Sequence, residues 1–256
     1  MSITVKKSPS FSGTGGLRFT GNSSTTLLAV KQSSVIPWTP AALGAALVAL
    51  YRADMGVTIV DVDKVSVWQD QSGNGKHLTQ VAAVNRPAYS ATGANGKPCV
   101  SFNGTAAVLK TAAFTLNQPE HVMVVCKHSQ PEVTGYIVDG IAGNGMGVYI
   151  TNAEPNNVRT YGGSFGPTAS VVASDWKVID AVFNGANSKL GVNGGNHATG
   201  NVGTNNAGGL TVGAYGGGSV GYLPEDVAGI LITNRALTAS ERASAVQFFK
   251  TLAGIA

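Results

Sequence analysis

Charged side chains are scarce in this sequence. Asp, Glu, Lys and Arg together make up 12% of the 256 residues. Long solvent-exposed helices need many Lys and Glu residues, so this scarcity argues against a mainly helical protein. The formal net charge is only +4, and no basic run is longer than Lys6-Lys7. Nucleic-acid binding normally requires a dense basic patch, and we therefore expect no nucleic-acid partner.

Cysteine and long hydrophobic runs are also scarce. The two cysteines, Cys99 and Cys126, lie inside apolar strand-like segments. We predict two buried reduced thiols, with a disulfide between them as the alternative. No apolar run approaches the ~18 residues that cross a membrane, and no basic segment followed by an apolar one opens the chain. We therefore expect no membrane partner and no signal-peptide secretion.

Glycine, in contrast, is abundant, at 34 residues. Asn-Gly pairs between apolar segments are strong hairpin signals, because both residues tolerate a positive φ angle. They begin at Asn74, Asn95, Asn103, Asn144, Asn184 and Asn193. Turns repeated at this frequency predict one antiparallel all-β domain.

Short apolar segments between these turns predict the strands. They cover residues 46–52, 65–68, 98–103, 121–127, 136–139, 147–151, 158–161, 176–183, 189–194, 210–213 and 226–233. Residues 41–51 are rich in Ala and Leu and could also form a short helix. We expect Trp68 and Trp176 to be core residues.

One clear helix is predicted near the C-terminus. Thr238 and Glu241 have the spacing of a capping box, in which each side chain binds the backbone of the other residue. Apolar residues follow at helical spacing: Ala245, Phe248, Phe249 and Leu252. Gly254 is suited to end the helix.

The segment from Trp68 to Gly75, WQDQSGNG, predicts a rigid polar corner after a strand. It is preceded by LYRAD at residues 50–54 and followed by Arg86-Pro87 and by GKPCVSFNG at residues 96–104. Together these segments resemble the laminin-G-like, concanavalin-A-like jelly-roll modules of bacterial surface and phage proteins. The resemblance covers residues 37–256 and implies a jelly-roll sandwich with a C-terminal helix packed on it.

Residues 1–36 are polar and rich in Ser, Thr and Gly. Pro37 and Pro40 mark the boundary with the domain at residues 37–256, since neither can donate a hydrogen bond to a sheet. Two interpretations of residues 1–36 stay open. They form either a flexible leader or an arm that adds a strand to another copy of the chain or to a scaffold.

Residues for catalysis are hard to identify. A glycosidase needs two carboxyl groups on one face of a strand, and the close acidic pairs are Asp61 with Asp63 and Glu225 with Asp226. Asp61 and Asp63 fall where the resembled family has a variable loop, so we assign no catalytic residue. Residues 216–221 fit G-x-G-x-x-G by letters, but Pro224 opposes a following helix, and we expect a hairpin loop.

Two kinds of ligand site remain. Many laminin-G-like modules bind calcium, and the resemblance therefore implies four candidate calcium ligands: Asp54, Asp70, Asp139 and Asp226. We expect no other cofactor. Asp70 also fits a turn-forming role. Carbohydrate binding needs exposed aromatic rings, and Tyr161, Phe165, Tyr215 and Tyr222 lie in glycine-rich segments that could provide them.

These observations led to three hypotheses about function. The first is a non-enzymatic phage virion protein, either capsid decoration or tail-associated, that binds other virion proteins or itself through the arm. The second is a lectin module for surface glycans. The third is a polysaccharide-cleaving enzyme, which the carboxylate pattern supports least.

Overall fold

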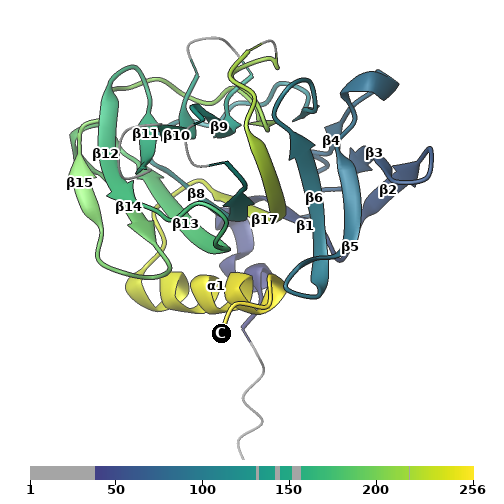
Figure 1. Cartoon of the computed structure of the whole chain (residues 1–256). Helices are drawn as coiled ribbons and strands as arrows, with labels where there is room; N and C mark the ends of the chain where they lie inside the picture. The colour runs from purple at the N-terminus through teal and green to yellow at the C-terminus, as the bar shows by residue number, and fades with distance from the viewer. Residues whose placement is uncertain (1–37, 131–132, 142–144, 152–156, 219) are drawn as a thin grey trace, which may run out of the picture. The chain divides into compact units, whose positions relative to one another are not determined.

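The computed structural model describes residues 38–130, 133–141, 145–151, 157–218 and 220–256 (Figure 1). The predicted arm at residues 1–36 and the predicted turn at Asn144 lie outside these residues. Residues Trp38–Ala256 form one unit.

The described part of the chain forms seventeen mostly short strands, all paired antiparallel. Strands β1 to β9 are β1 (Leu47–Arg52), β2 (Val57–Val60), β3 (Lys64–Trp68), β4 (Leu78–Thr79), β5 (Ala88–Ala94), β6 (Lys97–Asn103), β7 (Leu109–Lys110), β8 (Glu120–His128) and β9 (Gly135–Asp139). Strands β10 to β17 are β10 (Gly147–Thr151), β11 (Asn157–Tyr161), β12 (Phe165–Ser170), β13 (Lys177–Phe183), β14 (Ser188–Val192), β15 (Ala198–Gly200), β16 (Thr211–Val212) and β17 (Pro224–Thr233).

The strands form two layers. In the back layer, β17 pairs with β8 on one side and with β6 and β1 on the other, and β13, β14 and β15 follow β8 in that order. The front layer runs β2, β3, β4, β7, β16, β9, β10, β11 and β12. Strand β5 pairs with β6 of the back layer, and its single pairing with β3 joins the two layers at one side. This arrangement confirms the predicted all-β sandwich.

The main apolar core lies between the two layers. Strand alternation turns Val124 of β8 and Ile179 of β13 toward Val148 and Ile150 of β10. Trp68 is completely buried and closes this core, and its Nε1 donates a hydrogen bond to the Arg52 carbonyl at 2.8 Å. Trp176 is also buried, so both tryptophans are core residues as predicted.

The helix α1 (Ala239–Leu252) covers the outer face of the back layer (Figure 1). The predicted capping box is confirmed. Thr238 Oγ1 accepts a hydrogen bond from the Glu241 amide at 3.3 Å, and Glu241 Oε2 accepts one from the Thr238 amide at 2.8 Å. Phe249 is fully buried against Leu231 and Met123, whereas Phe248 is only partly buried and packs edge-on against Trp38.

Residues 41–51, for which a strand and a short helix were both considered, contain one of each. A 3₁₀ helix, η1 (Pro40–Ala46), begins at the proline and leads directly into β1. Gly44 breaks the helical pattern with a φ of 53°. The predicted strand is therefore confirmed, and the Ala-rich start forms a short helix before it.

The corner after β3 is built around the Asp70 carboxylate. It accepts hydrogen bonds from the amides of Leu50, Ser72 and Lys76, at 2.9–3.0 Å, and from the Ser72 hydroxyl at 2.8 Å. Burial alone would raise the pKa of Asp70, but these hydrogen bonds lower it. Asp70 therefore forms the turn, and it ties that turn to β1.

The Asn-Gly pairs form fewer hairpins than predicted. Asn95-Gly96 is a two-residue turn between β5 and β6, with φ angles of 48° and 84°. Asn184, in contrast, precedes the 3₁₀ helix η3 (Gly185–Asn187), and Asn103 uses its side chain to accept three backbone amides of the following loop. The local signal marks turns correctly, but it does not determine which turns join paired strands.

Two further expectations concern the cysteines and membrane crossing. Cys99 and Cys126 are both buried and free, which confirms the predicted thiols. Among the described residues, no helix has the length and hydrophobicity needed to cross a membrane.

Candidate functional site

The outer face of the front layer carries a group of aromatic side chains. Strand alternation directs Ile137, Val148 and Val158 into the core. The intervening side chains of the same strands project outward. We call the resulting surface the aromatic face, and it consists of Tyr136 on β9, Tyr149 on β10, Tyr161 on β11, Phe165 on β12 and Tyr215 in the loop after β16.

The five rings form one connected series. The ring centroids of Tyr161 and Phe165 are 5.4 Å apart, and those of Phe165 and Tyr149 are 6.2 Å apart. Tyr149 stacks on Tyr136 at 5.2 Å, and Tyr136 contacts Tyr215 at 5.0 Å. Side chains from five separate segments therefore form a single aromatic surface.

Arg159 stabilises one end of this surface. Its guanidinium lies 4.5 Å from the centre of the Phe165 ring, within the range of a cation–π interaction. It also interacts with the Tyr149 side chain. Tyr149 is only 5% exposed, whereas Phe165 is 61% exposed. The rings therefore rest on a buried tyrosine and present Phe165 to solvent.

Asp139 lies beside the other end of the aromatic face. Burial raises its pKa to about 6, although the amides of Gly216 and Gly140 favour the charged form. Asp139 Oδ2 accepts the Gly216 amide at 2.7 Å, while Oδ1 is buried and has no hydrogen-bond partner among the described residues. Burial and this carboxylate together raise the pKa of Tyr136 to about 12. Tyr136 therefore stays protonated, and Asp139 fixes the start of the loop that follows Tyr215.

The structure brings together three of the four aromatic residues predicted for ligand binding. Tyr161, Phe165 and Tyr215 belong to the aromatic face. Tyr222 makes no ring contact within the described residues, and its hydroxyl donates to the Gly218 carbonyl at 2.7 Å. Tyr161 ends β11, which corresponds to the strand predicted at residues 158–161, whereas Phe165 begins β12, a strand that was not predicted.

Sequence reasoning missed Tyr136, Tyr149 and Arg159. The sequence contains a signal for the two tyrosines, since each alternates with β-branched core residues in a predicted strand. The outward direction of Tyr149 follows from the inward direction of Val148 and Ile150. The pairing of β9 with β10, which makes the rings adjacent, does not follow from local sequence.

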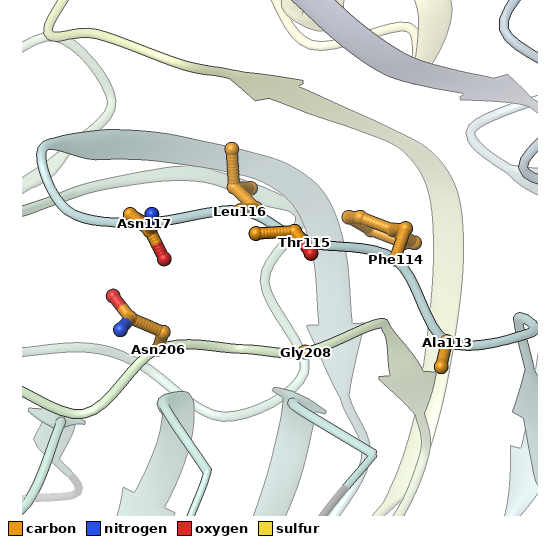
Figure 2. A pocket seen from close by; sticks show the side chains of 7 residues that line it. All are labelled: Ala113, Phe114, Thr115, Leu116, Asn117, Asn206 and Gly208. Atoms are coloured by element: carbon orange, nitrogen blue, oxygen red, sulfur yellow. The ribbon is translucent and has the colours of Figure 1, made fainter.

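A second feature is a groove at the side of the sandwich, along residues 112–117. These residues run from β7 toward β8 and pair with the segment before β16, through Phe114 N to Gly208 O at 3.1 Å and Thr111 N to Leu210 O at 2.9 Å. One hollow of ≈ 350 Å³ is shown in Figure 2, where the Asn117 and Asn206 side chains point toward each other. It is lined by Ala113, Phe114, Thr115, Leu116, Asn117, Asn206 and Gly208.

Two more hollows continue from the first. One, of ≈ 390 Å³, shares Ala113 and Phe114 with it and reaches Lys76 and His77. The other, of ≈ 440 Å³, shares Lys76 with the second hollow and Thr115 with the first. We call this connected surface the Phe114 groove. Sequence reasoning did not find it, because its walls come from several segments that are far apart in the sequence.

The four candidate calcium ligands lie apart and have other partners. Asp54 pairs with Arg52 at 2.7 Å, and Asp226 pairs with Lys127 at 2.9 Å. Asp70 accepts backbone amides, and Asp139 accepts the Gly216 amide. Within the described residues, no group of three His, Cys, Asp or Glu side chains is placed to hold a metal ion.

No protein-family model matches the chain, and no curated protein matches it in sequence. Solved structures do match its fold. The Trypanosoma rangeli sialidase in complex with sialic acid matches with a TM-score of 0.59 at 15% identity, over 81% of this chain and 34% of the sialidase. This chain therefore spans about a third of that enzyme.

Two other matches come from arabinose-processing proteins. Domain 4 of AbnA, a GH43 extracellular arabinanase from Geobacillus stearothermophilus, was solved with arabinotriose. It matches with a TM-score of 0.56 at 16% identity, over 79% of this chain and 98% of that domain. An arabinofuranosidase complexed with arabinofuranosyl-alpha-1,2-xylobiose matches with a TM-score of 0.57 at 14% identity, over 74% of this chain and 51% of the enzyme.

These comparisons contradict the first functional hypothesis. The predicted non-enzymatic phage virion protein, whether capsid decoration or tail-associated, is wrong, because the similar structures are carbohydrate-processing enzymes or a domain of one. The prediction that the protein is not an enzyme is contradicted by the same matches. At 14–16% identity, the matches themselves establish the all-β fold.

Proposed function

We propose that this chain is a carbohydrate-binding sandwich domain of the laminin-G-like, concanavalin-A-like type that takes part in glycan processing. It holds an oligosaccharide on the aromatic face. The observation that carries this proposal is the connected series of five rings on the outer side of β9 to β12, with Phe165 61% exposed.

The physical basis is stacking. A sugar ring has one face of C–H groups that packs on an aromatic ring, and its hydroxyls bind polar groups at the edge. Rings on a sheet are already held in place, so binding costs little side-chain entropy. Phe165 and Tyr161 provide the platform, and Arg159 is close enough to Phe165 to donate to a hydroxyl.

The matches supply the first ligands to test. The match covers 98% of the AbnA domain, which was solved with arabinotriose. The arabinofuranosidase was solved with arabinofuranosyl-alpha-1,2-xylobiose. These bound sugars support neutral pentose oligosaccharides as probes. Calorimetry with such sugars then identifies the ligand of this chain.

Isothermal titration calorimetry with arabinotriose and xylotriose tests the proposal. We expect measurable binding of at least one sugar by the wild-type chain and a loss of at least tenfold in affinity for Phe165→Ala. The control is Val81→Ala, which shortens an even more exposed apolar side chain elsewhere and should leave binding unchanged. An equal loss in both variants would refute the aromatic face as the binding site, and so would binding unaffected by Phe165→Ala.

A further inference from the structure

We propose that the Phe114 groove is a second saccharide subsite and that it selects a sugar carrying a carboxylate, a uronic acid. This inference rests on the proposed carbohydrate-binding function, but it concerns different residues. The juxtaposition that carries it is an unpaired lysine beside an aromatic ring in a groove with no acidic side chain.

The lining of the groove has one sign of charge. The three hollows are lined by Lys76 and His77 and by amide, hydroxyl and apolar residues, with no Asp or Glu among them. The Lys76 Nζ lies 5.0 Å from the centre of the Phe114 ring and has no ion-pair partner among the described residues. An anionic group placed in the groove therefore meets a cation without displacing another acid.

Two polar side chains of the groove, His77 and Asn206, offer hydrogen-bond donors. His77 Nδ1 accepts a hydrogen bond from the Asp70 amide at 3.1 Å, so the ring proton is on Nε2, which can donate. Asn206 Oδ1 already accepts the Gln118 amide at 2.9 Å, which leaves its NH₂ group as a donor. A carboxylate has only acceptors at neutral pH and matches this set of donors.

The groove is also preorganised. The Asp70 carboxylate fixes the backbone of Lys76, and the Tyr51 hydroxyl donates to the Lys76 carbonyl. On the opposite wall, residues 111–114 are held by backbone hydrogen bonds to Leu210 and Gly208. Phe114 is half-buried between two hollows, so a sugar can lie against it with its carboxylate directed to Lys76. Rigid walls reduce the entropy that binding must overcome.

The test compares trigalacturonate with its fully methyl-esterified form by calorimetry on the full chain. We expect the acid to bind at least tenfold more tightly than the ester, with an affinity that falls as salt is added, because Lys76 is accessible to solvent. Lys76→Met keeps the apolar stem on Phe114 and should lower affinity for the acid at least tenfold. Lys97→Met, a control at an exposed lysine at the start of β6, should not.

The outcomes separate this proposal from the previous one. Equal binding of acid and ester, no binding of the acid, or equal effects of Lys76→Met and Lys97→Met would each overturn the acidic subsite. If Phe165→Ala weakened acid binding as much as Lys76→Met, the sugar would lie on the aromatic face, and only the groove proposal would fail. Acid binding that depends on Lys76, without any neutral sugar binding, would support the groove and refute the aromatic face.

Discussion

The guanidinium of Arg242 on α1 and the carboxylate of Asp180 on β13 form a bidentate ion pair that joins the helix to the back layer. Arg242 Nε lies 2.8 Å from Asp180 Oδ1, and Nη2 lies 2.9 Å from Oδ2. The Asp180 side chain is completely buried, and His197 Nε2 lies 2.5 Å from the same Oδ1. Burial opposes ionisation of Asp180, but its interactions with His121, Arg242 and His197 together lower its pKa well below the ordinary value.

Loss of Arg242 should therefore destabilise the domain. Removing one partner of a buried pair leaves an uncompensated charge, and we expect Arg242→Ala to reduce the free energy of unfolding by about 3 kcal/mol. Arg235→Ala is the control, because its pair with Glu241 is partly exposed and should contribute no more than about 1 kcal/mol. Urea denaturation measures both. Equal losses in the free energy of unfolding would mean that the Arg242–Asp180 pair does not stabilise the packing of α1 on the sheet.

The buried Glu120 should make stability depend on pH. Burial raises its pKa from 4.5 to about 8, and neither of its carboxyl oxygens has a hydrogen-bond partner in the part of the chain that the structure describes. The folded protein thus retains a proton that the unfolded chain has released. The stability linked to this proton is complete below about pH 4.5 and is lost as pH rises through about 8, a decrease on the order of 5 kcal/mol.

Glu120→Gln should flatten this pH dependence. The amide is neutral at every pH, so the variant should be more stable than wild type at pH 8 and similar to it at pH 4.5. Some slope will remain, because burial also raises the pKa of Glu225. Glu241→Gln is a control of opposite sign: its Arg235 partner lowers the pKa of Glu241 to about 2, so its stabilising effect is lost on acidification instead. Parallel pH curves for wild type and Glu120→Gln would contradict the prediction.

Two glycines with the same backbone angle should differ in their tolerance of alanine. Gly213 and Gly73 have φ angles of 86° and 88°. A methyl group at Gly73 would meet open space, whereas one at Gly213 would collide with the Phe102 ring. We expect Gly73→Ala to cost about 1 kcal/mol from backbone strain alone. Gly213→Ala should cost at least about 3 kcal/mol, because overpacking adds to the strain. Thermal unfolding of the two variants measures the difference, and equal melting temperatures would refute it.

The two thiols should be unreactive in the folded protein. Burial, followed by the charge of Asp226, raises the pKa of Cys99 to about 11, and burial raises that of Cys126 further. Since the thiolate is the reactive form, Ellman's reagent at pH 8 should label neither residue in the native state and both in urea. Rapid native labelling of either cysteine would show that its surroundings open in solution.

The parts of the fold that were predictable have local signals. The Thr238 and Glu241 capping box acts over three residues, and Asp70 forms its turn with Ser72 and Lys76, so both could be read from the sequence. Strands β2 and β5 were missed, because their side chains are mostly half-exposed and lack a clear alternation.

The candidate sites were less predictable because they depend on pairing. The distance between Tyr136 and Tyr149 follows from the register of β9 against β10, which residues nearby in sequence do not determine. The Phe114 groove needs residues 112–117, 206–208 and 74–77 to meet, and no local signal in any one of these segments points to the others. The sequence could propose exposed aromatic rings, but only the topology defined their order.

Strand β17 has a consequence for how the chain is made. Its residues pair with β6, β8 and β1 along both sides, so strands formed early in synthesis depend on one of the last. Leu47 of β1 meets Thr233 of β17, nearly the full length of the domain away in sequence. Contacts of this separation slow folding, because a long loop must close before they form. On the ribosome, the sandwich therefore cannot be completed until β17 has emerged, and a nascent chain that stalls before it would expose three unpaired strand edges.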